Sequence, residues 1–154
     1  MILDNEDDPV FNDAAKMASS LGFSLVDLSV RKKDNRVMVS AILTGPEGFG
    51  IAECAKVHRL LMPRLEVLYD QKDVYLEVSS PGLERVFRHQ NEFEVFVGRP
   101  IKFLLQGASE WQAGILHEVL PETLKILERG EVVTFVRSQV VKARLDMLGE
   151  NSDK

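Results

Sequence analysis

The stretch that divides the two halves of the chain is VYLEVSSPGLER, residues 74–85. Residues 74–78 alternate apolar and polar side chains, which predicts a strand with one buried face. The Pro81-Gly82 pair that follows is typical of a type II turn, and such a turn requires a positive φ at the glycine. We therefore expect a strand that ends in a rigid turn formed by Ser79, Ser80, Pro81 and Gly82.

Two helices are expected upstream of this strand. The first begins at Asp8 and Pro9, because aspartate caps free N–H groups and proline lacks one, and it ends at Gly22. The second begins near residue 51, and Pro63 is expected to kink or shorten its last turn. Its expected inward stripe consists of Ile51, Cys54, Ala55, His58, Leu61 and Leu65.

A strand hairpin is expected between these helices. Val26, Leu28 and Val30 are expected on one face of the first strand, and residues 37–43 repeat the pattern. Residues 33–36 are turn-rich and predict an antiparallel connection. The order helix-strand-strand-helix-strand, with one apolar face on each strand, predicts a small sheet covered on one side by both helices.

The second half of the chain has a different pattern of predicted secondary structure. A short helical piece over 91–97, with Phe93, Phe96 and Val97 inward, ends at the Gly98-Arg99-Pro100 break. Five short β-like runs then follow, which predict a small closed barrel. They cover residues 101–105, 111–119, 123–127, 132–137 and 140–145, with a tight hairpin at Arg129-Gly130.

The predicted fold class is therefore α+β, with an N-terminal α-β-β-α-β domain followed by a small β-barrel. The first domain is placed at 1–90, with 83–98 as a connecting helical segment, and the barrel at 99–150. Because each half has its own apolar alternation, we expect fragments 1–90 and 99–150 to fold independently. No long apolar stripe is left over for a dimer, so a monomer is expected.

Composition excludes several classes of protein. The 154 residues include one cysteine, so no intramolecular disulfide framework is expected, and no Cys/His cluster offers a metal site. The start MILDNEDDPV is acidic, unlike a secretory signal, and no apolar run approaches the roughly 18–20 residues of a membrane span. We expect a cytoplasmic protein that makes no membrane contact.

Sequence motifs for catalysis are weak. Residues 45–50 match the GxxxxG half of a phosphate-binding loop, but Ile51 and Ala52 stand where lysine and a hydroxyl residue are needed. Cys54 and His58 lie four residues apart on the expected apolar stripe, which favours a buried thiol over a catalytic pair. We therefore expect neither an enzyme nor a cofactor.

Basic residues form two candidate contact sites. The net charge is −5 and the sequence pI is about 5.3, so any RNA contact has to come from local clusters. The exposed hairpin tip supplies the first cluster, Arg31, Lys32, Lys33 and Arg36. Arg85 and Arg88, expected on one helical face, form the second, although ion pairing with Glu84 or Glu92 is an equally good use of these arginines.

The string EVSSPGLER, residues 77–85, resembles the signature of the ribosome maturation factor RimP family. The resemblance extends over nearly the whole chain, from the acidic first helix through FEVFVG at 93–98 to the C-terminal barrel. One departure is Val86-Phe87, where the family commonly has Pro-Leu. The resemblance implies a KH-like N-terminal domain and an SH3- or Sm-like barrel.

The resemblance also implies a function. It implies a non-enzymatic assembly factor that binds the free or immature small (30S) ribosomal subunit and assists its late maturation. The expected partners are 16S rRNA and a basic small-subunit protein near the decoding centre, contacted by the C-terminal domain. Two rival functions are open: a stand-alone RNA-binding regulator that uses the Sm-like barrel, and a hydrolase built on Ser80 and His89, which lacks the strand-turn-helix elbow of such enzymes.

Overall fold

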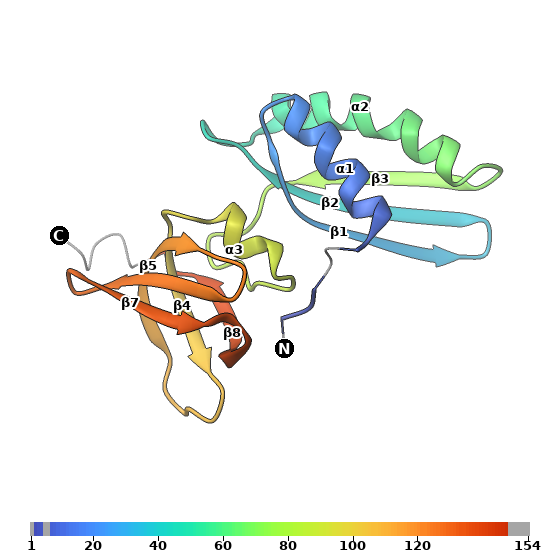
Figure 1. The fold of residues 1–154 in the computed structure, drawn as a ribbon. Helices are drawn as coiled ribbons and strands as arrows, with labels where there is room; N and C mark the ends of the chain where they lie inside the picture. Colours follow the sequence, from blue (N-terminus) through green and yellow to red (C-terminus); the bar gives the residue numbers. More distant parts are fainter. Residues whose placement is uncertain (1, 5–6, 148–154) are drawn as a thin grey trace. The chain divides into compact units, whose positions relative to one another are not determined.

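The computed structural model describes residues 2–4 and 7–147. The chain divides into two compact units, Glu6–Pro81 and a second unit made of Met1–Asn5 together with Gly82–Lys154 (Figure 1). No helix within the described residues is long and apolar enough to cross a membrane.

The first unit has the expected α-β-β-α-β order. Its elements are α1 (Pro9–Ser20), β1 (Ser24–Lys33), β2 (Arg36–Thr44), α2 (Ile51–Leu68) and β3 (Asp73–Ser79). The sheet order is β1-β2-β3, in which β2 pairs antiparallel with β1 and parallel with β3. Both helices lie on the same face of this sheet, as Figure 1 shows, so the core lies between that face and the helices.

The ends of α1 are those expected from the sequence. The Asp8 carboxylate accepts hydrogen bonds from the backbone N–H groups of Val10 and Phe11, at 3.0 and 3.2 Å. Gly22 follows the helix with a φ of 83°, a backbone conformation that favours glycine. Cap and stop are both local signals, which explains why the sequence alone located them.

The inward stripe of α2 differs from the expected one. Ile51 is 91 % exposed and His58 is exposed, whereas Val57, Leu61 and Leu65 are buried. The helix also continues through Pro63 to Leu68 instead of stopping early. The helical periodicity was predicted correctly. The buried face is rotated about the helix axis relative to the prediction, because Val57 and not His58 packs toward the sheet.

A β-bulge breaks the alternation expected in β1. The register shifts between Leu25 and Asp27, so Val26 does not share the core-facing side occupied by Leu28 and Val30. Val26 and Asp27 are nevertheless buried, at 0 and 2 % exposure. A bulge adds one residue opposite a single partner, and periodicity alone does not reveal it.

The second unit contains the five expected strands. They are β4 (Pro100–Leu105), β5 (Gln112–Val119), β6 (Thr123–Glu128), β7 (Glu131–Val136) and β8 (Val140–Leu145), preceded by α3 (Asn91–Val95). A 3-10 turn, η1 (Arg137–Gln139), joins β7 to β8. Arg129 and Gly130 both have positive φ, at 51° and 82°, as a two-residue hairpin turn requires.

The strands of the second unit form one curved antiparallel sheet. Its order is β7-β6-β5-β4-β8, and within the described residues no ladder joins β7 to β8. The expected closure by hydrogen bonds is therefore not found, and the barrel is open along this seam. Val97, expected to point inward, is 46 % exposed, whereas Phe93 and Phe96 are buried as expected.

Residues 82–98 belong to the second unit, although the sequence placed them with the first or between the two. Phe87 donates its backbone N–H to Ala143 of β8 at 2.9 Å, and Leu145 donates to Arg85 at 2.9 Å. Phe87 also contacts the rings of Phe93 and Phe96 in the core of this unit. The segment thus covers the outer edge of β8 instead of acting as a connector.

The start of the chain also pairs within the second unit. Leu3 donates its backbone N–H to Arg88 at 2.8 Å and accepts one from Gln90 at 2.8 Å, and Ile2 is buried. These contacts join residues that are more than 80 positions apart in the sequence. No local pattern predicts such a pairing.

Candidate functional site

The cationic hairpin, defined as Arg31, Lys32, Lys33 and Arg36, lies at the tip of β1 and β2 as expected. All four side chains are exposed. Lys33 pairs with Arg36 across the Asp34-Asn35 turn, and Asp34 has a φ of 55°. Strand pairing continues up to the two residues of the turn. The four positive charges are therefore held on one short and rigid hairpin tip.

The four cations do not all point to the same side. Val37 and Val39 face the helices, so alternation places Arg36 on the opposite, helix-free face of the sheet. The Arg36 guanidinium lies 5.9 Å from the centre of the Tyr75 ring on that face. Lys32 points to the helix side instead, where its ammonium lies 5.3 Å from the Tyr69 ring.

The helix-free face carries exposed apolar surface beside these cations. Met38 is paired with Arg31 on one side and Tyr75 on the other, and Met38 and Tyr75 are 48 and 49 % exposed. The Tyr75 hydroxyl donates to the Asp73 carboxylate at 3.1 Å. A half-exposed ring held by a neighbouring arginine and aspartate is a flat, rigid contact surface.

Arg85 is used differently from the expectation that placed it with Arg88. Its guanidinium forms two contacts with Glu92, Nε to Oε1 at 2.9 Å and Nη2 to Oε2 at 3.1 Å. Its side chain is 11 % exposed and that of Glu92 is fully buried. The alternative of ion pairing with Glu92 is therefore the one that the structure contains.

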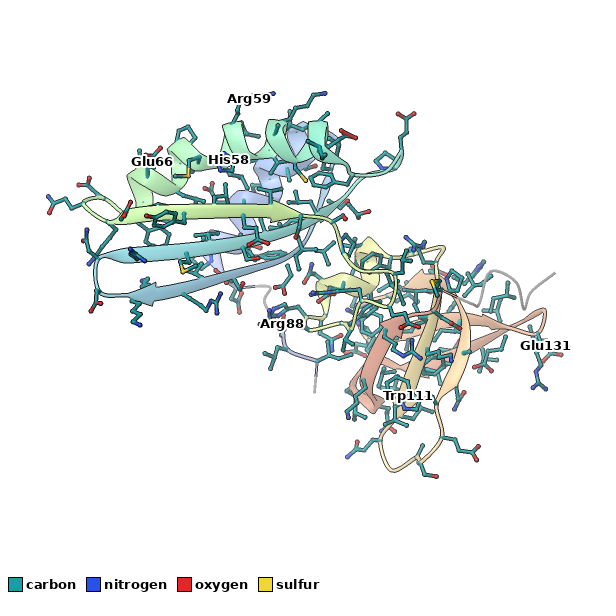
Figure 2. The ribbon with its side chains drawn as sticks, turned by 180° about the vertical axis from the view of Figure 1, so that it is seen from behind. His58, Arg59, Glu66, Arg88, Trp111 and Glu131 are labelled. Carbon is teal, nitrogen blue, oxygen red and sulfur yellow. The ribbon has the colours of Figure 1, made fainter. Side chains whose placement is uncertain are left out.

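Arg88 does not share a helical face with Arg85, because residues 85–88 are not helical. Arg88 is exposed (Figure 2), and its backbone N–H donates to Glu92 Oε2 at 2.7 Å. The buried Glu92 carboxylate therefore fixes the backbone at Arg88, and the Arg88 side chain is exposed to solvent.

The turn after β3 is displaced from its expected position. Gly82 does not have a positive φ, so the prediction of a type II turn centred on Pro81 and Gly82 is wrong. The turn begins at Gly82 instead, where the Arg85 N–H donates to the Gly82 carbonyl at 3.1 Å. Ser79, the last residue of β3, is half-buried, and Ser80 is exposed.

The exposed part of this segment includes a large apolar side chain. Leu83 is 67 % exposed, and a Cβ added to Gly82 would meet no atom within 4 Å. Neither backbone conformation nor crowding within the chain requires glycine at position 82. Residues 82–84 form an open surface with an apolar side chain at its centre.

Comparison with known proteins shows similarity to one family. The model of the RimP N-terminal domain matches residues 14–84, which include the cationic hairpin and most of the signature string. Proteins named ribosome maturation factor RimP are similar over nearly the whole chain. Residues 14–84 form a domain of the RimP N-terminal type, and the chain as a whole is similar to RimP proteins.

The RimP relatives are distant but align end to end. The protein from Borrelia turicatae is 25 % identical over 144 residues, which is 94 % of this chain and 97 % of the relative. The protein from Borrelia hermsii is 24 % identical over the same shares, and that from Borrelia recurrentis is 24 % identical over 125 residues. The similarity to these relatives thus extends through both units of the chain.

Side chains that suggested catalysis are not arranged for it in this protein. Burial raises the pKa of the Cys54 thiol, and the nearby Glu53 carboxylate raises it further, so the thiolate is disfavoured. His58 is exposed on α2 (Figure 2). Among the described residues, no group of three His, Cys, Asp or Glu side chains is placed to hold a metal ion.

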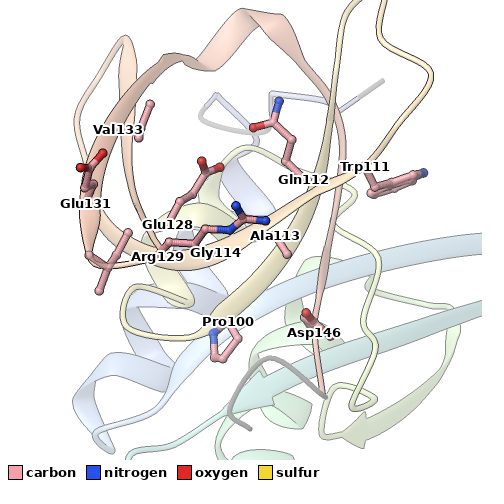
Figure 3. A pocket seen from close by; sticks show the side chains of 11 residues that line it. Pro100, Trp111, Gln112, Ala113, Gly114, Glu128, Arg129, Glu131, Val133 and Asp146 are labelled. Atoms are coloured by element: carbon pink, nitrogen blue, oxygen red, sulfur yellow. The ribbon is translucent and has the colours of Figure 1, made fainter. Parts of the chain in front are cut away.

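Sequence reasoning missed a pocket in the second unit. This pocket, called the β7 pocket below, has a volume of about 730 Å³ and is lined by Trp111, Glu128, Arg129, Glu131 and Asp146, among others (Figure 3). Glu128 Oε1 is buried there and accepts no hydrogen bond within the described part of the chain. No sequence signal links Trp111 with residues 128–131, because strand pairing brings them together.

Proposed function

We propose that this protein is a RimP family member that assists late maturation of the small (30S) ribosomal subunit by binding free or immature subunits. The observation that carries the proposal is similarity, over 94 % of the chain, to proteins named ribosome maturation factor. The proposed action is to hold ribosomal RNA and a basic ribosomal protein near the decoding centre in a productive arrangement. It requires no cofactor and no chemical turnover, and it takes place in the cytoplasm.

The cationic hairpin is the proposed RNA contact. Four exposed cations on one hairpin supply the local positive charge that a chain of net charge −5 otherwise lacks. Met38 and Tyr75 beside it offer apolar surface for a sugar or an unstacked base. Arg85 contributes little, because Glu92 already neutralises it, so Arg88 is the remaining candidate from the second pair.

A stand-alone RNA regulator based on the barrel is a weaker proposal. Barrels that bind single strands stack successive bases on exposed aromatic rings. Here Phe103 is buried and packs against Phe135 at 5.0 Å between ring centres. Trp111 is the aromatic side chain that remains substantially exposed, and one ring does not make a stacking platform.

Sedimentation with purified small subunits tests the proposal. The full chain is expected to co-migrate with immature or free small subunits and not with complete ribosomes. The double variant Arg31→Ala, Lys33→Ala should bind at least roughly tenfold more weakly, because two phosphate contacts are lost. The matched control Lys16→Ala, Lys142→Ala removes the same charge from exposed sites elsewhere and should bind like the parent chain.

Two results would contradict the proposal. Absence of co-migration at low salt would contradict the proposed ribosomal role. Equal weakening by the hairpin variant and the control variant would show that net charge, and not the hairpin, governs the association.

A further inference from the structure

Strand β7 has an unpaired outer edge. It ends the sheet order, and its only ladder within the described residues is with β6. The other end of the sheet is different, because residues 85–87 pair with the outer edge of β8. The second unit therefore protects one of its two edges and leaves the other open.

The register identifies which groups face the open edge. The two-residue turn closes on the pair Glu128 and Glu131, so every second pair from there exchanges backbone hydrogen bonds with β6. The N–H and C=O groups of the remaining residues point outward. These residues are Val132, Thr134 and Val136.

The composition of β7 does not block pairing with another strand. Natural sheets protect open edges with proline, lysine or inward charges, and residues 132–136 read VVTFV, with none of these. Val132 and Val136 are 50 and 51 % exposed. β-branched residues favour the extended backbone to which a further strand can be added at an exposed sheet edge.

The β7 pocket lies beside this edge and is acidic. Glu131 and Val133 of β7 line it together with Glu128, and Figure 3 shows the two glutamates toward one end and Asp146 toward the other. Three carboxylates and one guanidinium, that of Arg129, give the lining a formal charge of −2. Glu128 Oε1 is buried and has no hydrogen-bond partner within the described residues, so a donor that reached it from the pocket would meet an unsatisfied acceptor.

The open edge and the acidic pocket together determine which kind of partner can bind there. A phosphate backbone is repelled by the carboxylates. A second copy of the chain cannot pair its β8 here, since residues 85–87 already cover that edge. An extended and basic polypeptide satisfies both the open backbone groups and the acidic lining.

We propose that the outer edge of β7 and the β7 pocket bind an extended basic segment of a protein partner. The segment adds a strand along Val132, Thr134 and Val136 and places a lysine or arginine side chain among the pocket carboxylates. The inference rests on the proposed function for the identity of the partner, a basic ribosomal protein, and supplies the surface that this partner would use.

The test uses the full chain and an eight-residue peptide of alternating lysine and valine. Affinity is measured by calorimetry, and hydrogen exchange at each amide is measured by NMR. Binding is expected to slow exchange at the amides of Val132, Thr134 and Val136 by roughly tenfold or more, since these N–H groups gain acceptors. The fluorescence of Trp111, the single tryptophan, should change because it lines the pocket.

Two variants distinguish the contribution of backbone hydrogen bonds to peptide binding from the contribution of pocket charge. Thr134→Pro removes an outward N–H without removing a bond to β6, and Glu131→Lys reverses an exposed charge at the pocket. Each is expected to weaken the peptide by about tenfold or more. Glu66→Lys changes the net charge equally at an exposed site on α2 in the first unit and should bind like the parent chain (Figure 2). Urea unfolding confirms that each variant is folded.

Three outcomes would overturn the proposal. They are unchanged exchange at the three amides, equal effects of Glu131→Lys and Glu66→Lys, and concentration-dependent protection of β7 in the free chain, which would indicate a second copy. Because the peptide assay contains no ribosome, its result is independent of the sedimentation result. A chain that binds the peptide but not the subunit would retain this surface and lose the proposed function.

Discussion

Glu92 binds Arg85 through both carboxylate oxygens, at 2.9 and 3.1 Å, although the two residues flank a turn that carries no regular secondary structure. The same Oε2 accepts the backbone N–H groups of Arg88 and His89, at 2.7 and 3.0 Å. One buried carboxylate therefore organises the whole segment that follows the family signature. The signature arginine has a structural role, and this explains why its charge is not available at the surface.

Removal of Arg85 is expected to destabilise the second unit strongly. Arg85→Ala leaves the fully buried Glu92 carboxylate without its cation, which costs about 3–5 kcal/mol. Urea unfolding followed by Trp111 fluorescence measures this, since the single tryptophan lies in the second unit. Glu118→Ala, which breaks the exposed pair with Lys125, is the control and should cost less than about 1 kcal/mol. Equal costs would mean that the buried pair contributes no more than a surface pair.

Fragments should fold according to the structural boundary. A fragment of residues 99–150 lacks Phe87, Phe93 and Phe96, which are all buried in the second unit, and is expected to be unfolded. A fragment of residues 82–150 retains them and should give a dispersed amide NMR spectrum, as should residues 7–81. A dispersed spectrum from 99–150 would show that the segment before Pro100 is dispensable.

Glycines 82 and 114 should respond differently to alanine. At Gly114 a Cβ would lie 2.5 Å from Ile126 Cγ2 and 2.7 Å from the Leu127 carbonyl oxygen, so Gly114→Ala should cost about 1–3 kcal/mol. Gly82 has no such neighbour and no positive φ, so Gly82→Ala should leave the unfolding free energy within about 0.5 kcal/mol of the parent value. Urea titration measures both effects.

The Gly82 variant also tests the functional role of the signature. Weaker sedimentation with small subunits at unchanged stability would place residues 82–84 at the contact. Strong destabilisation of Gly82→Ala would contradict the local backbone geometry described above.

Salt dependence should be modest if the cationic hairpin provides the RNA contacts. Four cations that meet four phosphates predict that log K falls by roughly three to four units per log unit of salt, at about 0.7–0.9 per phosphate. Titration of subunit binding between low and physiological salt measures the slope. A slope near ten would mean that many more phosphates are contacted and that the mixed RNA and protein interface is wrong.

Cys54 should react slowly with alkylating reagents. Burial and the adjacent Glu53 raise its pKa, so the thiolate fraction at a given pH is smaller than for an unfolded cysteine. The midpoint of the alkylation rate against pH should lie above that of the chain in urea, and Glu53→Gln should move it down. A native midpoint at or below the value in urea would contradict the burial of this thiol.

Local signals explain which parts of the fold were predictable. The Asp8 cap, the Gly22 stop and the Arg129-Gly130 turn depend on backbone chemistry within a few residues, and all three were located from the sequence. The strands of the second unit were located to within one residue at every end, because alternation and turn residues coincide there. The α+β order follows from these elements.

Non-local packing explains the rest. The bulge at Val26, the rotated face of α2 and the pairing of Leu3 with Arg88 and Gln90 each depend on a partner far along the chain. The candidate sites divide in the same way. Exposure of the cationic hairpin follows from its position at a turn, so the sequence alone determined it, together with the family resemblance and the order of elements. The burial of Arg85 on Glu92 and the assembly of the β7 pocket were decided only by tertiary structure, because segments that approach through packing leave no periodic pattern in the sequence.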